Sequence, residues 1–211
     1  MLVLVACECS GVVRRAFRAA GHEAWSCDVQ ASDDDSEFHI QKDVLEVLND
    51  RDWDLVIAHP PCTYLCVSGQ HWNTRKNPDG SLKYPNRQAQ TEKAVEFFMA
   101  FTQLQCKFAI ENPICIMSTR WRKPDQIVQP YEYGHDASKK TCLWLSGLPK
   151  LQPTEIVSPR IVEHTGKKRK RWANQTDSGQ NCLAPSKTRS KQRSQTYEGI
   201  AEAMAAQWGS L

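Results

Sequence analysis

Short apolar runs alternate with helical patterns along the first half of the chain. Residues 2–6, 55–58 and 108–110 are continuous apolar runs, which are typical of strands buried on both faces of a sheet. Residues 12–20 and 87–105 place apolar side chains at helical spacing. Strands that alternate with helices predict an α/β fold with a mostly parallel central sheet.

The remaining elements are predicted from weaker patterns. Further strands are expected at residues 22–26, 39–44, 126–133 and 140–145. Residues 196–208 form the last predicted helix, with an apolar stripe that must pack against the rest of the protein.

Cys62 follows the apolar run 55–58. His59-Pro60-Pro61 stops this strand, because proline cannot donate to a sheet ladder and fixes its own backbone angle. Open α/β sheets bind their ligands at the carboxyl ends of such strands. A thiol held there suits nucleophilic attack, and the alternative is a small buried side chain, the commonest fate of a free cysteine.

The apolar run 108–110 ends in a similar way, at Glu111-Asn112-Pro113. A carboxylate at the tip of an apolar strand is costly to bury unless it has a partner or a function. We therefore expect Cys62 and Glu111 to face one pocket from neighbouring strand ends.

The first strand leads into the turn Cys7-Glu8-Cys9-Ser10-Gly11, and the second strand ends at Asp28. In such a βαβ unit the turn and the helix N-terminus bind a cofactor, and the acid binds ribose hydroxyls. Gly11 is the only glycine of the turn, so a plain α/β turn with a surface aspartate is the alternative. Asp33-Asp34-Asp35 is expected on a solvated loop.

Charge is distributed unevenly along a chain whose formal net charge is +3. Residues 160–193 contain 10 Lys and Arg against 2 Asp and Glu, whereas residues 1–159 contain 17 against 20. The basic segment shows no clear periodicity. It favours contact with a polyanion, although a solvated loop has the same composition.

The nine cysteines are scattered and include no C-x-x-C pair, so we expect reduced thiols and no metal site. No apolar run approaches the ~20 residues of a membrane span. The opening run 2–5 is too short for a signal peptide. We expect a protein without a membrane segment, in the cytoplasm.

With these residues assembled, the chain resembles the DNA cytosine-5 methyltransferases, in particular small phage-encoded members. Pro60-Pro61-Cys62 matches the nucleophile motif of that family, and Glu111-Asn112 matches its acid motif. Cys9-Ser10-Gly11 resembles a reduced form of the cofactor motif. Lys139-Lys140 lies where the family has arginines that hold the base and the phosphate.

The resemblance implies a Rossmann-like S-adenosylmethionine-dependent methyltransferase fold with a small recognition insertion. It implies methyl transfer from S-adenosylmethionine to carbon 5 of cytosine in DNA, with Cys62 as the nucleophile and Glu111 as the acid. The expected regions are a cofactor-binding and catalytic core at 1–113, a target-recognition region at 114–195, and a C-terminal helix at 196–211 that packs back on the core.

The other expected site residues form two groups. The cofactor-binding residues are Glu8, Ser10, Gly11, Asp28, Asp43 and Pro60. The DNA- and base-binding residues are Asn112, Lys139, Lys140, Lys167, Lys168 and Arg169. Residues 66–86, directly after Cys62, are expected to lack regular structure and to close over the base.

Three other functions agree with parts of the sequence. A nucleic-acid-binding or host-interaction protein without catalysis is favoured by the single-glycine turn. An exocyclic-amine DNA methyltransferase is less favoured, because those enzymes place an acid or asparagine before the two prolines, where this chain has His59. A methylase of free pyrimidine nucleotides would leave the basic segment without a use.

Overall fold

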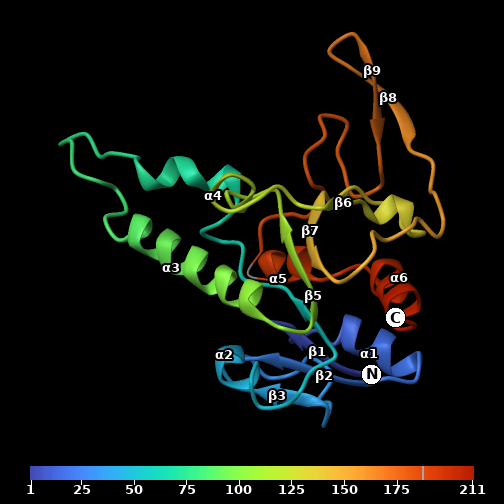
Figure 1. Ribbon diagram of the computed structural model, residues 1–211. Coiled ribbons are helices and arrows are strands. Elements are labelled where there is room, and N and C mark those ends of the chain that lie inside the picture. Colours follow the sequence, from blue (N-terminus) through green and yellow to red (C-terminus); the bar gives the residue numbers. More distant parts are fainter. Residues whose placement is uncertain (187) are drawn as a thin grey trace.

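A seven-stranded sheet runs through the structure in the order β3-β2-β1-β4-β5-β7-β6 (Figure 1). The computed structural model describes residues 1–186 and 188–211. Neighbouring strands from β3 to β5 are parallel, and β7 is antiparallel to both β5 and β6. The predicted α/β fold with a mostly parallel sheet is therefore confirmed. The strands are β1 (Leu2–Ala6), β2 (Glu23–Asp28), β3 (His39–Gln41), β4 (Leu55–Ala58), β5 (Lys107–Pro113), β6 (Gln126–Val128) and β7 (Thr141–Ser146).

The first five strands follow the order 3-2-1-4-5 of doubly wound α/β sheets. In that order the winding reverses between β1 and β4, and ligands bind there, outside the carboxyl ends of the strands. β1 ends directly before Cys7, and β4 ends directly before His59. The two segments singled out in the sequence thus lie at this edge of the sheet.

Alternate strand residues pack against two layers of helices. Val3 and Ile57 belong to the core under α1 (Val12–Ala19) and α6 (Glu198–Trp208), which lie side by side in Figure 1. Leu4 and Val56 belong to the opposite core, with α2 (Val44–Val47) and α3 (Arg87–Ala100). Burial on both faces explains why these strands read as continuous apolar runs. The remaining short helices are η1 (Val67–Asn73), η2 (Phe101–Gln103), α4 (Met117–Arg120), η3 (Pro130–Glu132) and α5 (Arg189–Ser194).

The start of α6 is held close to the segment before β7. A side chain at Gly199 would clash with the carbonyl oxygen of Tyr133. The backbone N–H of Gly199 donates to Nε2 of His135 at 2.9 Å. The C-terminal helix therefore packs on the sheet layer next to the strand ends.

Region 114–195 divides between the sheet and a separate hairpin. β6 and β7 belong to the seven-stranded sheet, so the boundary expected at residue 113 falls inside this sheet. β8 (Arg160–His164) and β9 (Lys167–Arg171) pair only with each other in the described chain and extend away from the sheet (Figure 1). Both turn residues, Thr165 and Gly166, have positive φ, as in two-residue hairpin turns.

Residues 66–86 are ordered, which corrects the expectation of an irregular loop. They contain η1 and an isolated bridge between Lys76 and Leu82. The Trp72 and Tyr84 rings pack edge to face with their centroids 5.4 Å apart, and the Arg75 guanidinium lies over the Trp72 ring. Local aromatic packing therefore orders a segment whose composition alone is typical of a loop.

Two absences are established for residues 1–186 and 188–211. No helix there is both long and apolar enough to cross a membrane. No group of three or more His, Cys, Asp and Glu side chains in the same residues is arranged to hold a metal ion.

Candidate active site

Two hydrogen bonds tie the end of β4 to the end of β5. Nδ1 of His59 lies 2.7 Å from Oε2 of Glu111, and Nδ2 of Asn112 donates to the carbonyl oxygen of Pro60 at 2.7 Å. The strands are parallel, with Ala58 opposite Ile110. The structure thus brings Cys62 and Glu111 to one edge of the sheet.

His59 and Glu111 form a buried pair, with side chains only 13% and 8% exposed. Burial disfavours the charged form of each group. Even so, the pKa of Glu111 is lowered and the pKa of His59 is raised, because each charge stabilises the other across the hydrogen bond. The buried pair therefore favours a carboxylate bound to an imidazolium over two neutral groups.

Cys62 begins the turn that comes after the two prolines and is half-buried. Its carbonyl oxygen accepts hydrogen bonds from the N–H groups of Leu65 and Cys66, at 3.0 and 2.9 Å. Burial raises the pKa of the Cys62 thiol, Cys66 and Glu111 raise it further, and Lys139 lowers it. Cys62 is therefore a neutral thiol at neutral pH and must lose its proton before it can attack.

The structure separates Lys139 from Lys140. Lys139 lines a small hollow beside Glu111, and its Nζ donates to the carbonyl oxygens of Ser194 and Gln195 at 3.4 and 3.0 Å. Lys140 is exposed. Of these two lysines, Lys139 is therefore the one that lies beside Glu111 and whose charge acts on the Cys62 thiol.

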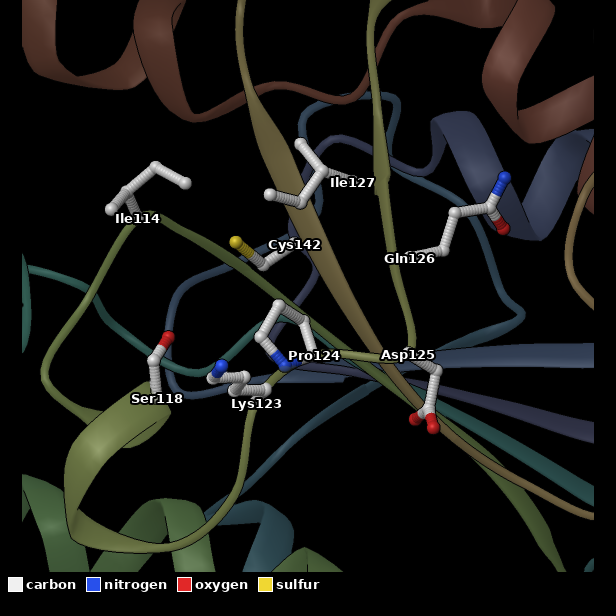
Figure 2. A pocket seen from close by; sticks show the side chains of 8 residues that line it. All are labelled: Ile114, Ser118, Lys123, Pro124, Asp125, Gln126, Ile127 and Cys142. Carbon is white, nitrogen blue, oxygen red and sulfur yellow. The ribbon is translucent and has the colours of Figure 1, made fainter.

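The space at the strand ends is small. The hollow beside Glu111 measures about 10 Å³ and is lined also by residues of the segment leading into α6. A larger hollow of about 380 Å³ lies between α4, β6 and β7 (Figure 2). Asp125 and Gln126 in its wall are already bonded to the Leu145 N–H and to the backbone of Leu151. We therefore assign the larger hollow to the packing of β6 and β7, not to the reaction.

The predicted cofactor turn is filled by the chain's own groups. Glu8 is 5% exposed, and its two oxygens accept from the backbone N–H groups of Val13 and Arg14 at 2.7 and 3.2 Å. Ser10 Oγ donates to the same carboxylate at 3.3 Å, and Gly11 has a φ of 68°. The carboxylate occupies the anion-binding N-terminus of α1, so a cofactor phosphate would meet a like charge there.

Arg14, in the first turn of α1, links this turn to neighbouring segments and was not identified as a site residue from the sequence. It is 1% exposed and donates to Ser26 Oγ at 2.9 Å and to Asp34 Oδ2 at 2.5 Å. Partial burial opposes the charge of Asp34, but hydrogen bonds from Ser32, Arg14 and Arg15 hold its pKa well below the usual range. Asp34 is thus a structural carboxylate, which corrects the expectation of a solvated loop.

Asp28 and Asp43 stand at neighbouring strand ends. Asp28 accepts from the Gln30 N–H at 2.9 Å, and Asp43 caps α2 by accepting from the Leu45 N–H at 3.0 Å. Burial raises the pKa of the Cys7 thiol, and the Asp28 and Asp43 carboxylates raise it further. Both acids therefore lie near the end of β1. S-adenosylmethionine has ribose hydroxyls, a positive charge and no phosphate, so these residues and Glu8 fit it better than they fit a dinucleotide.

The basic residues of the hairpin stand apart from this edge. Lys167, Lys168 and Arg169 are exposed on β9, and the hairpin points away from the sheet (Figure 1). Successive strand residues point to opposite faces, so Lys168 lies on one face and its two neighbours on the other. The structure does not bring these three residues to Cys62.

His59 is the main site residue that the sequence reasoning missed. Its Nε2 is buried without a hydrogen-bond partner among the described residues, although its Nδ1 holds Glu111. The available signal was its place between an apolar strand and two prolines. Its partner can be known only from the register of β4 against β5.

Comparisons with known proteins add little to this geometry. No protein-family model matches the chain, and no curated protein matches it. One similar solved structure is that of an Escherichia coli protein encoded within a prophage and provisionally assigned as a DNA modification methyltransferase. It is 16% identical, with a TM-score of 0.48 over 74% of this chain and 52% of that chain. The chain thus spans about half the length of that protein, and a likeness at this level defines neither chemistry nor substrate.

The fold and the site define an α/β protein of the doubly wound class. A thiol and a paired carboxyl stand at its strand ends, next to a turn whose anion site is already filled.

Proposed function

We propose that the protein transfers a methyl group to carbon 5 of cytosine in DNA through a covalent adduct with Cys62. The observation that supports this most strongly is the pair of 2.7 Å hydrogen bonds that fixes the Pro60-Pro61-Cys62 segment against Glu111 and Asn112. The sequence resemblance to the DNA cytosine-5 methyltransferases rests on the same residues.

The chemistry explains why a thiol and a carboxyl are needed together. Carbon 5 of cytosine is a poor nucleophile, and addition of the Cys62 thiolate to carbon 6 makes it enamine-like. Glu111 lends a proton, or a strong hydrogen bond, to ring nitrogen 3 as negative charge develops there. S-adenosylmethionine supplies the methyl group when bound. A water molecule then takes the carbon-5 proton, the electron pair of that C–H bond re-forms the double bond between carbons 5 and 6, and Cys62 leaves carbon 6 as a thiolate while the N3 proton returns to Glu111.

Ionisation of Cys62 requires help, since its pKa is raised. Lys139 is the cation that opposes this shift, and it also lines the hollow beside Glu111. We assign to Lys139 the stabilisation of the Cys62 thiolate. Lysine does this as a point charge, without the planar two-fold contact that arginine makes.

The target base must leave its stack to reach Cys62. A hollow of about 10 Å³ holds no pyrimidine, so the nucleotide has to be flipped out, or be single-stranded, and the wall of the hollow has to open. Thr196 and Tyr197, just before α6, form part of that wall. The exposed cations of β9 contact DNA phosphates, which position the duplex without reading sequence.

The test uses DNA that contains 5-fluorocytosine, because fluorine cannot leave as a cation after methyl addition and the adduct is held. Incubation of the full chain with this DNA and S-adenosylmethionine should give a covalent protein–DNA species that survives denaturation. Cys62→Ser should give none. Cys106→Ser is the matched control, since Cys106 is also half-buried but precedes the opposite end of β5. No adduct on single- or double-stranded DNA, and no 5-methylcytosine by bisulfite sequencing of DNA from expressing cells, would refute the proposal.

A second candidate is a nucleic-acid-binding protein of the same fold without catalysis. The raised pKa of Cys62 and the small hollow beside Glu111 favour it. Titration calorimetry separates the two, because the enzyme must bind S-adenosylmethionine and a pure binding protein need not. Mass spectrometry of digested DNA distinguishes 5-methylcytosine from the product of an exocyclic-amine methyltransferase.

A further inference from the structure

The His59–Glu111 pair fixes one oxygen of the carboxyl and leaves the other for a ligand. Nδ1 of His59 lies 2.7 Å from Oε2 of Glu111, and both side chains are largely buried. No hydrogen bond to Oε1 of Glu111 is found among the described residues. Glu111 lines the small hollow at the strand ends, so Oε1 is the oxygen available to a base that enters there.

We infer that His59 is a positioning residue for the proposed methyl transfer: it orients Glu111 through Oε2, and the imidazole–carboxyl pair, not Glu111 alone, holds the proton that Oε1 lends to ring nitrogen 3. This inference rests on the proposed function. It assigns a role to the residue that precedes the two prolines, where an exocyclic-amine enzyme would carry an acid or asparagine.

The proton balance is simple. Before transfer, Glu111 carries the proton on Oε1, and neutral His59 donates from Nδ1 to Oε2. As the Cys62 thiolate forms its bond to carbon 6, the Oε1–H bond breaks and the N3–H bond forms. The electron pair of the O–H bond stays on Glu111 as a carboxylate, which the Nδ1–H group continues to bind. The ion pair of imidazolium and carboxylate contains the same number of protons as this reactive form. The two forms therefore differ only in where the proton lies.

Charged and titratable groups from the neighbouring strand ends act on the His59–Glu111 pair. Glu8, in the turn after β1, favours the imidazolium, whereas Lys139, in the segment before β7, disfavours it. Besides burial, the Glu111 carboxylate raises the pKa of the Cys62 and Cys142 thiols. The proton of the pair is therefore lost in a macroscopic step that belongs to both groups. Because an imidazolium takes part, this step lies at higher pH than the loss of a proton from a lone carboxyl.

The pairing is tested first without any reaction. NMR titration of the histidine ring in the wild-type protein should give a His59 pKa above its usual value of about 6.5. In Glu111→Gln the His59 pKa should fall, because burial remains and the anion is gone. A His59 pKa that does not respond to Glu111→Gln would overturn the inference, whether or not the protein is an enzyme.

Single-turnover kinetics then test whether His59 helps Glu111 to hold the proton that is transferred. His59→Asn keeps a donor near the place of Nδ1 but cannot hold a proton, and His59→Ala loses both properties. At low pH the wild-type protein should be only slightly faster than His59→Asn in a single turnover. As pH rises, the ratio of the two rates should grow about tenfold per pH unit until the wild-type pair itself loses its proton. His59→Ala should be slower than His59→Asn at every pH. His22→Asn is the control, since His22 lies next to the N-terminus, and its ratio should stay near one.

The outcomes are distinguishable from failure of the proposed function. Suppose that the wild type transfers methyl groups and that the ratio of its rate to the His59→Asn rate does not change with pH. His59 then only supports the fold, so the inference fails while the proposed function stands. No methyl transfer by the wild type refutes the function and with it the catalytic role of the pair, whereas the NMR titration still decides whether the pair exists. Melting temperatures of each variant confirm that folded proteins are compared.

Discussion

Replacing Asn112 tests whether the bond between two strand ends holds the site together. Asn112 is 1% exposed, and its Nδ2 donates at 2.7 Å to the carbonyl oxygen of Pro60. Asn112→Ala leaves that buried oxygen without a donor, which should lower the free energy of unfolding by about 1–3 kcal/mol. Asn112→Asp has a similar shape but places an oxygen where the donor was.

The loss of stability in Asn112→Asp should depend on pH. Burial raises the pKa of the introduced carboxyl in the folded protein above the unfolded value of about 3.9. The folded state then binds the proton more tightly, so stability relative to wild type falls as pH rises above about 4. At lower pH the protonated carboxyl donates to Pro60 as the amide did, and the difference should nearly disappear.

Urea denaturation followed by tryptophan fluorescence between pH 4 and pH 8 measures this, provided that the m-value is unchanged. Asn49→Asp is the matched control, because Asn49 is exposed and lies in the turn after α2, away from any helix N-terminus. It should track the wild type at every pH. If Asn112→Asp also tracks the wild type, the bond to Pro60 does not hold the strand ends. If Asn112→Ala keeps its stability but binds DNA weakly, Asn112 is a base contact, as the family resemblance implied.

Three further predictions concern other parts of the molecule. A triple variant with alanine in place of Lys167, Lys168 and Arg169 should bind all DNA sequences about equally more weakly. The salt dependence of its binding should fall by up to ~0.9 for each phosphate that is no longer neutralised. Fluorescence anisotropy measures this slope, and an unchanged slope would mean that the hairpin does not touch DNA. Arg14→Met should lower the free energy of unfolding by about 3–5 kcal/mol, because it leaves Asp34 and Ser26 without their buried partner. Since the pKa of Asp34 is depressed in the folded state, its stabilisation is present above about pH 4 and lost as pH falls, so Asp34→Asn should flatten the acid side of the stability curve.

The sheet and the place of the site could be predicted from the sequence because both depend on burial. Strands such as Leu55–Ala58 are buried on both faces and read as continuous apolar runs, and the residues directly after each strand must lie at a sheet edge. The position of Cys62 and Glu111 at that edge needed no knowledge of strand register. Prolines and polar residues at the ends of the runs were sufficient.

The β8–β9 hairpin and the ordered residues 66–86 could not be predicted in the same way. Both faces of the hairpin are largely exposed, so no alternation of apolar residues marks its strands. Its turn, Thr165-Gly166, lacks the Asn-Gly or Asp-Gly signal that usually announces such hairpins. In residues 66–86 the order comes from rings that meet in space, such as Trp72 and Tyr84, and not from a period in the sequence.

The β1–α1 turn gives Glu8 a structural role that the sequence did not indicate, and that role bears on the proposed cofactor. The sequence pointed to Glu8 and Gly11 as contacts of a bound molecule, but Glu8 itself binds the helix N-terminus through the N–H groups of Val13 and Arg14. It takes the place that a phosphate takes in dinucleotide-binding folds. A second anion would be repelled there, and repelled again by Asp28 and Asp43 beside Cys7. A ligand with a positive charge would be attracted by the same acids. The sulfonium and ammonium groups of S-adenosylmethionine outweigh its single carboxylate, so its net positive charge suits this acidic edge better than the charge of a phosphate does, which favours the proposed methyl donor.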